Sequence, residues 1–274
     1  LLFNAYTKMF IVFDSSLKEK LVDDQIDYLN LSHNSLYLKL IESKSLIEDD
    51  TDELSQIKEI STIANYNTGN YILIINPTLD CNFRCWYCYE SHKKGSQMDE
   101  ETLSGVRKFI KKKIHSDEIE IFYLSFFGGE PLLKYIEVVE PLMEFSQEVC
   151  NATGKELVIG MTTNGYLFTE EIINSLLNYH ISGIQITLDG CREDHNKVRN
   201  AGKGRDSYQV ILDNMKMLLK HKIPVSLRIN YTAKNIRKAL DIKHDLVDLT
   251  DEMRGLLNVN LQRVWQDKDD PEAN

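Results

Sequence analysis

Tyr71-Ile-Leu-Ile-Ile-Asn76 and the nearby run Cys81-Asn-Phe-Arg-Cys85-Trp-Tyr-Cys88 form the stretch that decides the fold. The apolar run predicts a β-strand, and the cysteines follow shortly after its end. A C-x3-C-x2-C spacing places three soft thiolates on one short loop, and such thiolates are the usual ligands of iron–sulfur clusters. A cubane cluster has four irons, so three cysteines leave one iron without a protein ligand. We therefore expect one iron to be open to a small molecule.

Zinc is the alternative occupant of this loop. His92 follows Cys88 closely, and the three cysteines with His92 could form a Cys3His tetrahedron. Structural zinc sites usually draw on two separated ligand pairs, whereas all four candidate ligands here lie on one short segment. The spacing therefore favours an iron–sulfur cluster.

A second motif, Leu124-Ser-Phe-Phe-Gly128-Gly129-Glu130-Pro131, ends the next apolar run. Paired glycines let a ligand approach the backbone closely, and Pro131 can begin a helix. A carboxylate at the end of a strand can accept hydrogen bonds from an ammonium group. Taken alone, Gly-Gly-Glu-Pro is also typical of an ordinary βα turn. Its position on the strand after the cysteine loop favours a binding role.

Short strand-like runs alternate with helix-length amphipathic segments from Asn70 onward, which is typical of βα units around a parallel sheet. Asp99–His115 and Ser207–His221 have the apolar spacing of helices with one buried face, and Asp99 is a suitable N-cap. The six expected strands are Tyr71–Asn76, Ile119–Phe127, Glu156–Thr163, Gly183–Leu188, Val225–Tyr231 and Leu256–Arg263.

The positions of the motifs along these strands test the assignment. Parallel βα folds bind their ligands at the carboxyl ends of the strands, so residues with a chemical role should follow a strand directly. All of the candidates do. They are Cys81–Cys88, Gly128–Glu130, Thr163–Gly165, Thr187–Gly190 and Asn230.

These motifs together resemble the radical S-adenosylmethionine (SAM) superfamily, which has an aromatic residue, here Tyr87, before the last cysteine of its loop. The resemblance covers most of residues 70–265. It implies an α/β fold, a partial (β/α)6 barrel, with a [4Fe-4S] cluster whose open iron chelates the amino and carboxylate groups of SAM. The cluster ligands that it implies are Cys81, Cys85 and Cys88, and the SAM-binding residues are Tyr87, Gly128, Gly129 and Glu130.

Two further turns extend this resemblance. Met161-Thr-Thr-Asn-Gly165 and Ile186-Thr-Leu-Asp-Gly190 resemble strand ends of radical SAM peptide and sulfatase maturases. Asn-Gly and Asp-Gly are also very common turn formers, so turn chemistry alone would explain both. The resemblance implies that Asn164 and Thr187 contact SAM, and that an arginine of the following loop pairs with its carboxylate through a planar fork. The first candidate for that arginine is Arg199, and the alternative is Arg192.

Composition sets the class of protein. The 274 residues, 42% hydrophobic and 27% charged, predict a globular chain with one substantial core and a small appendage. A net charge of −10 argues against a nucleic-acid partner.

The five cysteines do not suggest a secreted disulfide framework and fit a reducing, cytoplasmic compartment. Cys150 and Cys191 are expected to be structural, and the opening Leu1–Phe13 is too short and polar to span a membrane.

Residues 1–66 are expected to form a small α+β module ahead of a barrel at 67–274. They predict a hairpin, helices around Ser15–Leu31 and Asn34–Ile41, and a turn at Leu46–Glu53. This order resembles the winged-helix, leader-peptide recognition element of some peptide-modifying radical SAM enzymes, and a structural cap over the barrel is the alternative. The missing initiator Met and the polar end Gln266–Asn274 suggest a segment of a longer protein. No cysteine follows Cys191, so the auxiliary-cluster domain of SPASM- or twitch-type maturases is expected to be absent or truncated.

The resemblance implies that the reduced cluster cleaves SAM to methionine and a 5′-deoxyadenosyl radical, which attacks one substrate hydrogen. The first expected function is modification of a ribosomally made precursor peptide by a thioether or carbon–carbon cross-link. Anaerobic sulfatase maturation, which oxidises Cys or Ser to formylglycine, is the alternative enzyme, and a non-catalytic zinc- or cluster-containing peptide-binding protein is the alternative of another class. The expected partners are a peptide or protein substrate and a reductant such as flavodoxin or ferredoxin, with neither nucleic acid nor membrane. No general acid or base is assigned.

Overall fold

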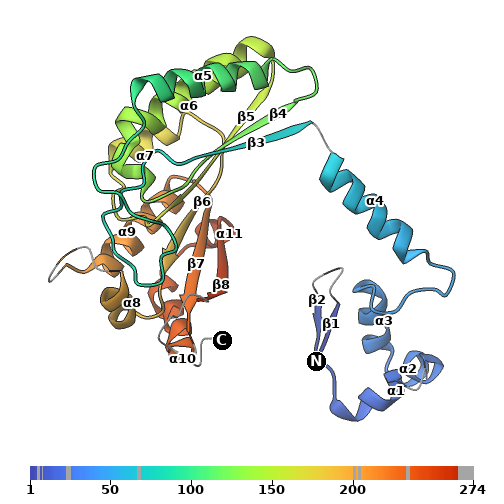
Figure 1. Cartoon of the computed structure of the whole chain (residues 1–274). Helices are drawn as coiled ribbons and strands as arrows, with labels where there is room; N and C mark the ends of the chain where they lie inside the picture. Colours follow the sequence, from blue (N-terminus) through green and yellow to red (C-terminus); the bar gives the residue numbers. More distant parts are fainter. Residues whose placement is uncertain are drawn as a thin grey trace. The chain divides into compact units, whose positions relative to one another are not determined.

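A computed structural model describes residues 1–4, 7, 9–22, 26–66, 69–199, 202, 205–232 and 235–264. The chain divides into two compact units, residues 1–67 and 68–274 (Figure 1). Lys8 of the expected hairpin and the polar end at residues 266–274 lie outside the described residues.

The second unit is built on a six-stranded parallel sheet whose strands follow one another in chain order, β3 to β8. This arrangement confirms the expected α/β class and all six expected strands. The pairing runs without interruption between most neighbouring strands, as where Ile75 of the first strand pairs with Phe126 of the second, whereas the register shifts by one residue between Ile159 and Gly160 in the pairing of the third and fourth strands. The strands are β3 (Asn70–Ile75), β4 (Ile121–Phe126), β5 (Glu156–Thr163), β6 (Ile181–Leu188), β7 (Val225–Tyr231) and β8 (Leu257–Arg263).

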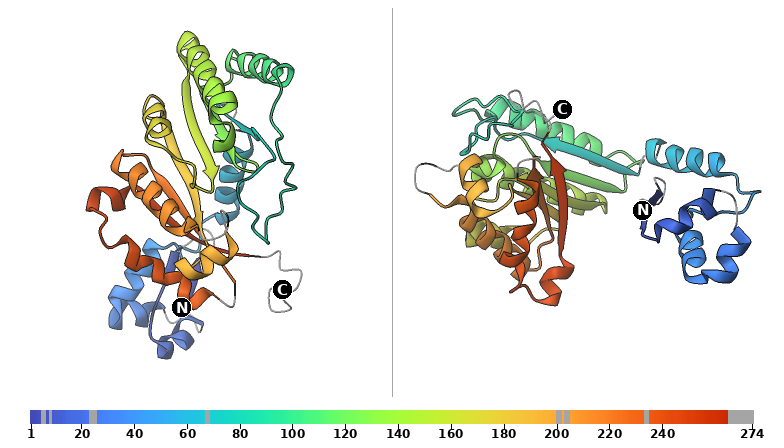
Figure 2. Two further views of the ribbon diagram at one scale, coloured as in Figure 1. Left: turned by 90° about the vertical axis from the view of Figure 1, so that its left-hand side faces the viewer. Right: turned by 90° about the horizontal axis from the view of Figure 1, so that it is seen from below.

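Helices cover one face of this sheet (Figure 2). The expected N-cap is confirmed, because the Asp99 side chain accepts a hydrogen bond of 2.8 Å from the Thr102 backbone N–H. The longer helices are α5 (Glu100–Ile114), α6 (Glu140–Thr153), α7 (Glu170–Leu176), α8 (Arg192–Val198) and α9 (Ser207–Lys220). The other helical segments of this unit are η2 (Pro131–Lys134), η3 (Tyr135–Val139), α10 (Ile236–Ala239), η4 (Leu240–Leu246) and α11 (Asp251–Gly255).

Side chains alternate between the two faces of each strand, so the apolar core and the candidate site lie on opposite faces of the sheet. In β4, Phe122, Leu124 and Phe126 are fully buried among the core residues, whereas the residues between them are half-buried on the other face. Burying one such large apolar side chain contributes about 1.5–3 kcal/mol. The same alternation leaves polar residues such as Thr187 and Arg228 on the uncovered face, which is the face that carries the candidate site.

The first unit contains the expected hairpin, formed by β1 (Leu2–Asn4) and β2 (Met9–Ile11). Its core residues are Ile11, Leu29, Leu36 and Leu40. Three short elements stand where a helix was expected over Ser15–Leu31, and residues 23–25 between them are not described. The turn expected at Leu46–Glu53 leads into the helix α4, and the sequence reasoning missed this helix. The helical elements are η1 (Ser15–Leu17), α1 (Lys18–Val22), α2 (Ile26–Ser32), α3 (Asn34–Glu42) and α4 (Glu53–Tyr66).

Across the described part of the chain, none of the helices combines the length and the apolar character that crossing a membrane requires.

Candidate functional site

A cavity of about 210 Å³ lies at the carboxyl ends of the parallel strands. The three cysteines of the loop after β3 line it, together with residues that end each of the other strands. The structure therefore brings together most of the residues that the sequence singled out. The predicted residues that line the cavity are Cys81, Cys85, Tyr87, Cys88, Gly128, Gly129, Thr163, Asn164, Thr187, Arg199 and Asn230. Those outside its lining include Glu130, Gly165, Asp189, Gly190 and the alternative arginine, Arg192.

The cysteine loop is held at its base by Asp80. One carboxylate oxygen accepts from the Cys81 N–H at 2.8 Å, and the other accepts from the Gly95 N–H at 2.7 Å. These bonds, the one to Gly95 first, lower the pKa of Asp80. Thr78 joins the same two ends of the loop through its hydroxyl, which donates to the Ser96 carbonyl at 2.5 Å. Sequence reasoning missed both residues, although Asx- and Thr-type loop bonds are common at such positions.

The three thiols differ in exposure. Cys81 and Cys85 are half-buried, whereas Cys88 is exposed. Burial raises the pKa of Cys81 to about 11, and burial also raises the pKa of Cys85. Because thiolates are the metal-binding form, iron must displace these protons when it binds. The Phe83 N–H already points at the Cys81 sulfur, 3.4 Å away, as hydrogen bonds to cluster sulfurs do.

The donor set fits a cluster better than a single metal ion. Within the described residues, no three His, Cys, Asp or Glu side chains converge on one point that could hold an ion. Cys88 Sγ lies 3.5 Å from His92 Nε2, but the remaining thiols do not complete a tetrahedron around them. A cubane takes each thiolate at a separate iron, so it needs no such convergence.

The paired glycines pack the turn after β4 against the base of the cysteine loop. A Cβ on Gly129 would lie 2.1 Å from the Asp80 carbonyl oxygen, and one on Gly128, whose φ is +101°, would lie 2.8 Å from the Thr78 carbonyl. The Gly129 N–H donates to that Thr78 carbonyl at 3.1 Å, and the Glu130 N–H donates to the Asp80 carbonyl at 2.9 Å. Paired glycines were expected to let a ligand approach the backbone closely. In the structure, the backbone of the cysteine loop at Thr78 and Asp80 makes this close approach.

Glu130 is fully buried, and its carboxylate is occupied by protein donors. The Thr163 hydroxyl donates to Oε1 at 2.6 Å, and the Asn164 backbone N–H donates to Oε2 at 2.8 Å. The Leu132 N–H supplies a third bond at 3.0 Å. Burial raises the pKa of this carboxyl, and these bonds oppose that shift. Glu130 therefore fixes the end of β5 in place, and its direct contact with an amino group stays a prediction.

Tyr87 ties the cysteine loop to the opposite strand ends. Its phenol donates to Asp189 Oδ2 at 2.6 Å and accepts from Arg199 Nη1 at 3.0 Å and from Asn230 Nδ2 at 3.1 Å. Arg199 also lies over the ring of Phe83, 5.6 Å from its centroid, which is within reach of a cation–π interaction. The four residues Tyr87, Asp189, Arg199 and Asn230 are called the phenol network below.

Burial and charge define the electrostatics of the phenol network. The Arg199 and Asp189 side chains are only 9% and 4% exposed, and their charged groups lie 4.0 Å apart. Burial raises the pKa of Asp189 and that of Tyr87, and the Arg199 guanidinium opposes both shifts. Asp189 Oδ1 and Arg199 Nε are buried without a hydrogen-bond partner among the described residues. Buried polar atoms are normally satisfied, so Arg199, which lines the cavity, is suited to meet a polar ligand through its Nε.

Two further cavity residues, Gln185 and Arg228, were missed. Each precedes a predicted residue of the same strand by two positions, Thr187 and Asn230 respectively. Alternate residues of a strand share a face, so the strand period was the signal that could have found them. Arg192, the alternative arginine, lies elsewhere and pairs at the surface with Asp206.

Comparison with known proteins identifies the family. Residues 75–246 match the Radical SAM superfamily. The chain belongs to this superfamily. Radical SAM proteins use an iron–sulfur cluster and SAM, which is what the resemblance of the motifs implied. The cysteines at 81, 85 and 88 are the described thiols suited to hold that cluster, and polar side chains line the cavity around them.

Two curated relatives illustrate the similarity. A serine-type anaerobic sulfatase-maturating enzyme of Bacteroides thetaiotaomicron is 26% identical over 60% of this chain and 40% of its own length. The radical SAM cyclopropyl synthase TigE of Paramaledivibacter caminithermalis is 24% identical over 84% of this chain and 51% of its own length. The chain thus spans about half the length of the curated relatives that it matches.

Solved structures share the fold. The enzyme anSMEcpe with bound AdoMet aligns with a TM-score of 0.60 and 21% identity over 74% of this chain and 55% of that chain. SuiB of Streptococcus suis, bound to S-adenosylmethionine, aligns with a TM-score of 0.51 and 12% identity over 98% of this chain and 61% of that chain. Both share the fold of this chain over the aligned parts.

Proposed function

We propose that this protein cleaves SAM reductively and modifies a ribosomally made precursor peptide, forming a thioether or a carbon–carbon cross-link. The observation that carries the proposal is the common cavity of the three thiols, the paired-glycine turn and the buried phenol network. When bound, the cluster and SAM supply a carbon-centred radical that removes a hydrogen atom from the substrate. Cys81, Cys85 and Cys88 would hold the cluster.

The chain's own residues would orient SAM and exclude water. Arg199 presents a buried guanidinium to the cavity, suited to a carboxylate because its planar fork offers parallel donors. Thr187 and Asn164 place a hydroxyl and an amide at neighbouring strand ends. Glu130 acts behind them as a positioning residue, because its carboxylate holds the Thr163–Asn164 end of β5. Such a fixed polar wall limits the poses from which a reactive group can attack.

The separate N-terminal unit supports a peptide substrate in this proposal, because a leader segment must be held away from the active site. We propose that residues 1–67 hold part of the substrate peptide. A small reductant protein such as flavodoxin or ferredoxin would supply the electron.

Sulfatase maturation is the second candidate. Two curated relatives are anaerobic sulfatase-maturating enzymes, one serine-type and one cysteine-type. The anSMEcpe structure has also been solved with bound AdoMet and the Kp18Cys peptide, at a TM-score of 0.60 to this chain. In this case the product would be formylglycine.

The experiment is an anaerobic assay on the protein reconstituted with iron and sulfide. Wild-type protein receives SAM, dithionite and either candidate precursor peptides taken from the reading frames beside its gene or a sulfatase peptide with Cys or Ser. We expect methionine and 5′-deoxyadenosine by chromatography, and a cross-linked precursor peptide by tandem mass spectrometry. Cys85→Ala should abolish both products, and Cys191→Ala, which lies outside the cavity, is the matched control. Formylglycine would favour the second candidate, and no SAM cleavage would refute both.

A further inference from the structure

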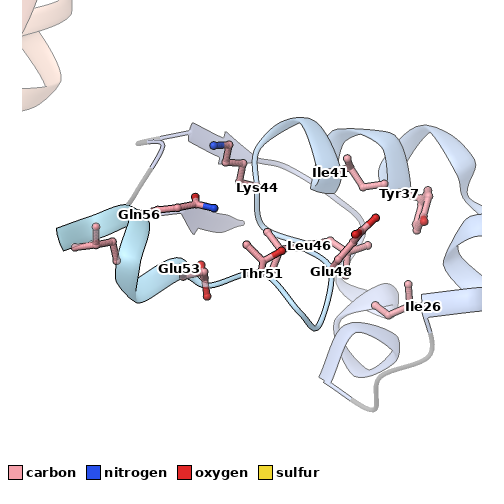
Figure 3. A pocket seen from close by; sticks show the side chains of 11 residues that line it. Ile26, Tyr37, Ile41, Lys44, Leu46, Glu48, Thr51, Glu53 and Gln56 are labelled. Carbon is pink, nitrogen blue, oxygen red and sulfur yellow. The ribbon is translucent and has the colours of Figure 1, made fainter. Parts of the chain in front are cut away.

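The N-terminal unit has a cavity of its own, of about 440 Å³. Side chains from α2, α3, the segment that follows α3, and the first turns of α4 surround it (Figure 3). All of these elements belong to residues 1–67. The function proposed above uses this unit without giving the cavity a role.

The walls of this cavity are apolar and accessible. Ile41, Ile47 and Ile57 line it and are 44%, 37% and 48% exposed. The core of the unit consists of Ile11, Leu29, Leu36 and Leu40, and these three isoleucines are not among the described residues that pack against it. A concave group of accessible apolar side chains is the usual form of a pocket for an apolar anchor of a ligand.

The rim of the cavity is acidic. The segment Glu48-Asp-Asp-Thr-Asp-Glu53 carries five carboxylates, and Glu48 and Glu53 themselves line the cavity. Asp52 accepts a bond of 2.9 Å from the Ser55 backbone N–H, and hydrogen bonds from Ser55 lower the pKa of this carboxyl, so it stays negative. Among the described residues of the lining, Lys44 is the one that is basic. An apolar pocket beside such a rim is complementary to an apolar side chain with basic neighbours.

We propose that this cavity, called the α3–α4 pocket, binds a basic segment of the substrate peptide, remote from the residue that is modified. One apolar side chain enters between Ile41, Ile47 and Ile57, and flanking lysines or arginines face the rim at residues 48–53. The hairpin offers less for strand addition, because β1 and β2 have only three residues each. This inference rests on the proposed peptide substrate and adds the chemistry of its docking segment.

Binding is measured by fluorescence anisotropy on the full chain, without SAM. The probe is a fluorescein-labelled peptide Gly-Lys-Lys-Leu-Leu-Lys-Lys-Gly, compared with one in which both leucines are serine and one in which all lysines are glutamate. We expect saturable binding of the first, binding about tenfold weaker or more for the serine peptide, and none for the glutamate peptide. Raising the salt concentration should weaken the first, because the rim charges are exposed and screened.

Variants locate the binding. Ile41→Gln and Ile57→Gln should each weaken the lysine peptide about tenfold or more, since each removes an apolar wall. Both side chains are half exposed, so the fold should tolerate the change, and circular dichroism checks this. Leu54→Gln is the matched control, because Leu54 is 61% exposed on the same helix and does not line the pocket. Glu48→Lys with Glu53→Lys should remove the preference for lysine over glutamate peptides.

Three outcomes would overturn the proposal. The first is that the lysine and glutamate peptides bind equally well. The second is that Ile41→Gln and Ile57→Gln leave the affinity for the lysine peptide unchanged. The third is that the protein self-associates and that Ile57→Gln abolishes this self-association. The last outcome would assign the pocket to a second copy of the chain. SAM cleavage and precursor modification by the wild-type protein are scored separately. If the precursor is modified but the lysine peptide does not bind, the docking inference alone fails.

Discussion

Asp189→Asn tests the phenol network directly. The substitution keeps the shape of the side chain and an acceptor for the Tyr87 hydroxyl, which lies 2.6 Å from Asp189 Oδ2. It removes the negative charge that faces Arg199 across 4.0 Å in a buried setting, where both side chains are less than a tenth exposed. Arg199 stays protonated, so the variant has an uncompensated buried charge.

The expected loss is about 3 kcal/mol of the free energy of unfolding, because breaking a buried ion pair from one side costs about 3–5 kcal/mol and Asn retains the hydrogen bond. In a domain of this size, that corresponds to a fall of roughly 6–12 °C in the unfolding midpoint. Asp206→Asn is the matched control, since the Arg192–Asp206 pair is 55% and 37% exposed. It should cost at most about 1 kcal/mol, because exposed pairs contribute little and Asn is an equally good N-cap for α9.

Urea unfolding of the metal-free proteins, followed by tryptophan fluorescence, compares the two variants. The double variant Asp189→Asn with Arg199→Gln removes both charges, so it should be less destabilised than the sum of the single variants by about 1–3 kcal/mol. The reasoning is refuted if Asp189→Asn costs no more than Asp206→Asn, or if the double variant is simply additive.

Two further substitutions probe the packing beneath the site. Gly129→Ala should destabilise the protein by about 3 kcal/mol, because its Cβ would meet the Asp80 carbonyl at 2.1 Å. Gly105→Ala is the control, because its Cβ would meet nothing within 4 Å, and it should be neutral or stabilise α5 by about 0.5–1 kcal/mol. Urea unfolding midpoints compare the two variants, and equal effects would contradict the crowding at Gly129. Burial of His195 lowers its pKa to about 2. The unfolded state therefore binds the extra proton between pH 2 and about 6.5, and stability should fall by about 1.4 kcal/mol per pH unit below about 6.5. Midpoints at pH 7, 6 and 5 should lose this slope in His195→Asn, and an unchanged slope would contradict the assignment.

Local patterns explain why the strands and the cavity rim could be predicted. Apolar runs that end in Gly-, Asp- or Asn-containing turns carry their own strand and turn signals, as in Ile186-Thr-Leu-Asp-Gly190. The same signals placed the cysteine loop and the paired glycines at one rim, and Figure 1 shows the resulting order of strands.

The partners within the site could not be predicted, because they are distant in sequence. Tyr87 meets Asp189, Arg199 and Asn230 only after the sheet has formed, at separations of 102, 112 and 143 residues. The sequence motif also could not show that the Glu130 carboxylate accepts hydrogen bonds from Thr163 and Asn164 at the end of β5, and its contact with the amino group of SAM stays a prediction. The helix α4 was missed because its apolar residues follow a run of carboxylates and are exposed rather than buried in a core.

The central claim is that Cys81, Cys85 and Cys88 hold a cluster with one iron open to SAM. Electron paramagnetic resonance and electron–nuclear double resonance of the reconstituted, dithionite-reduced protein test it most directly. We predict an iron–sulfur signal that changes when SAM is added, with a hyperfine coupling to the nitrogen of SAM labelled in its amino group. A protein that binds zinc alone, or a cluster signal that SAM leaves unchanged and that couples instead to a histidine nitrogen such as that of His92, would contradict the claim.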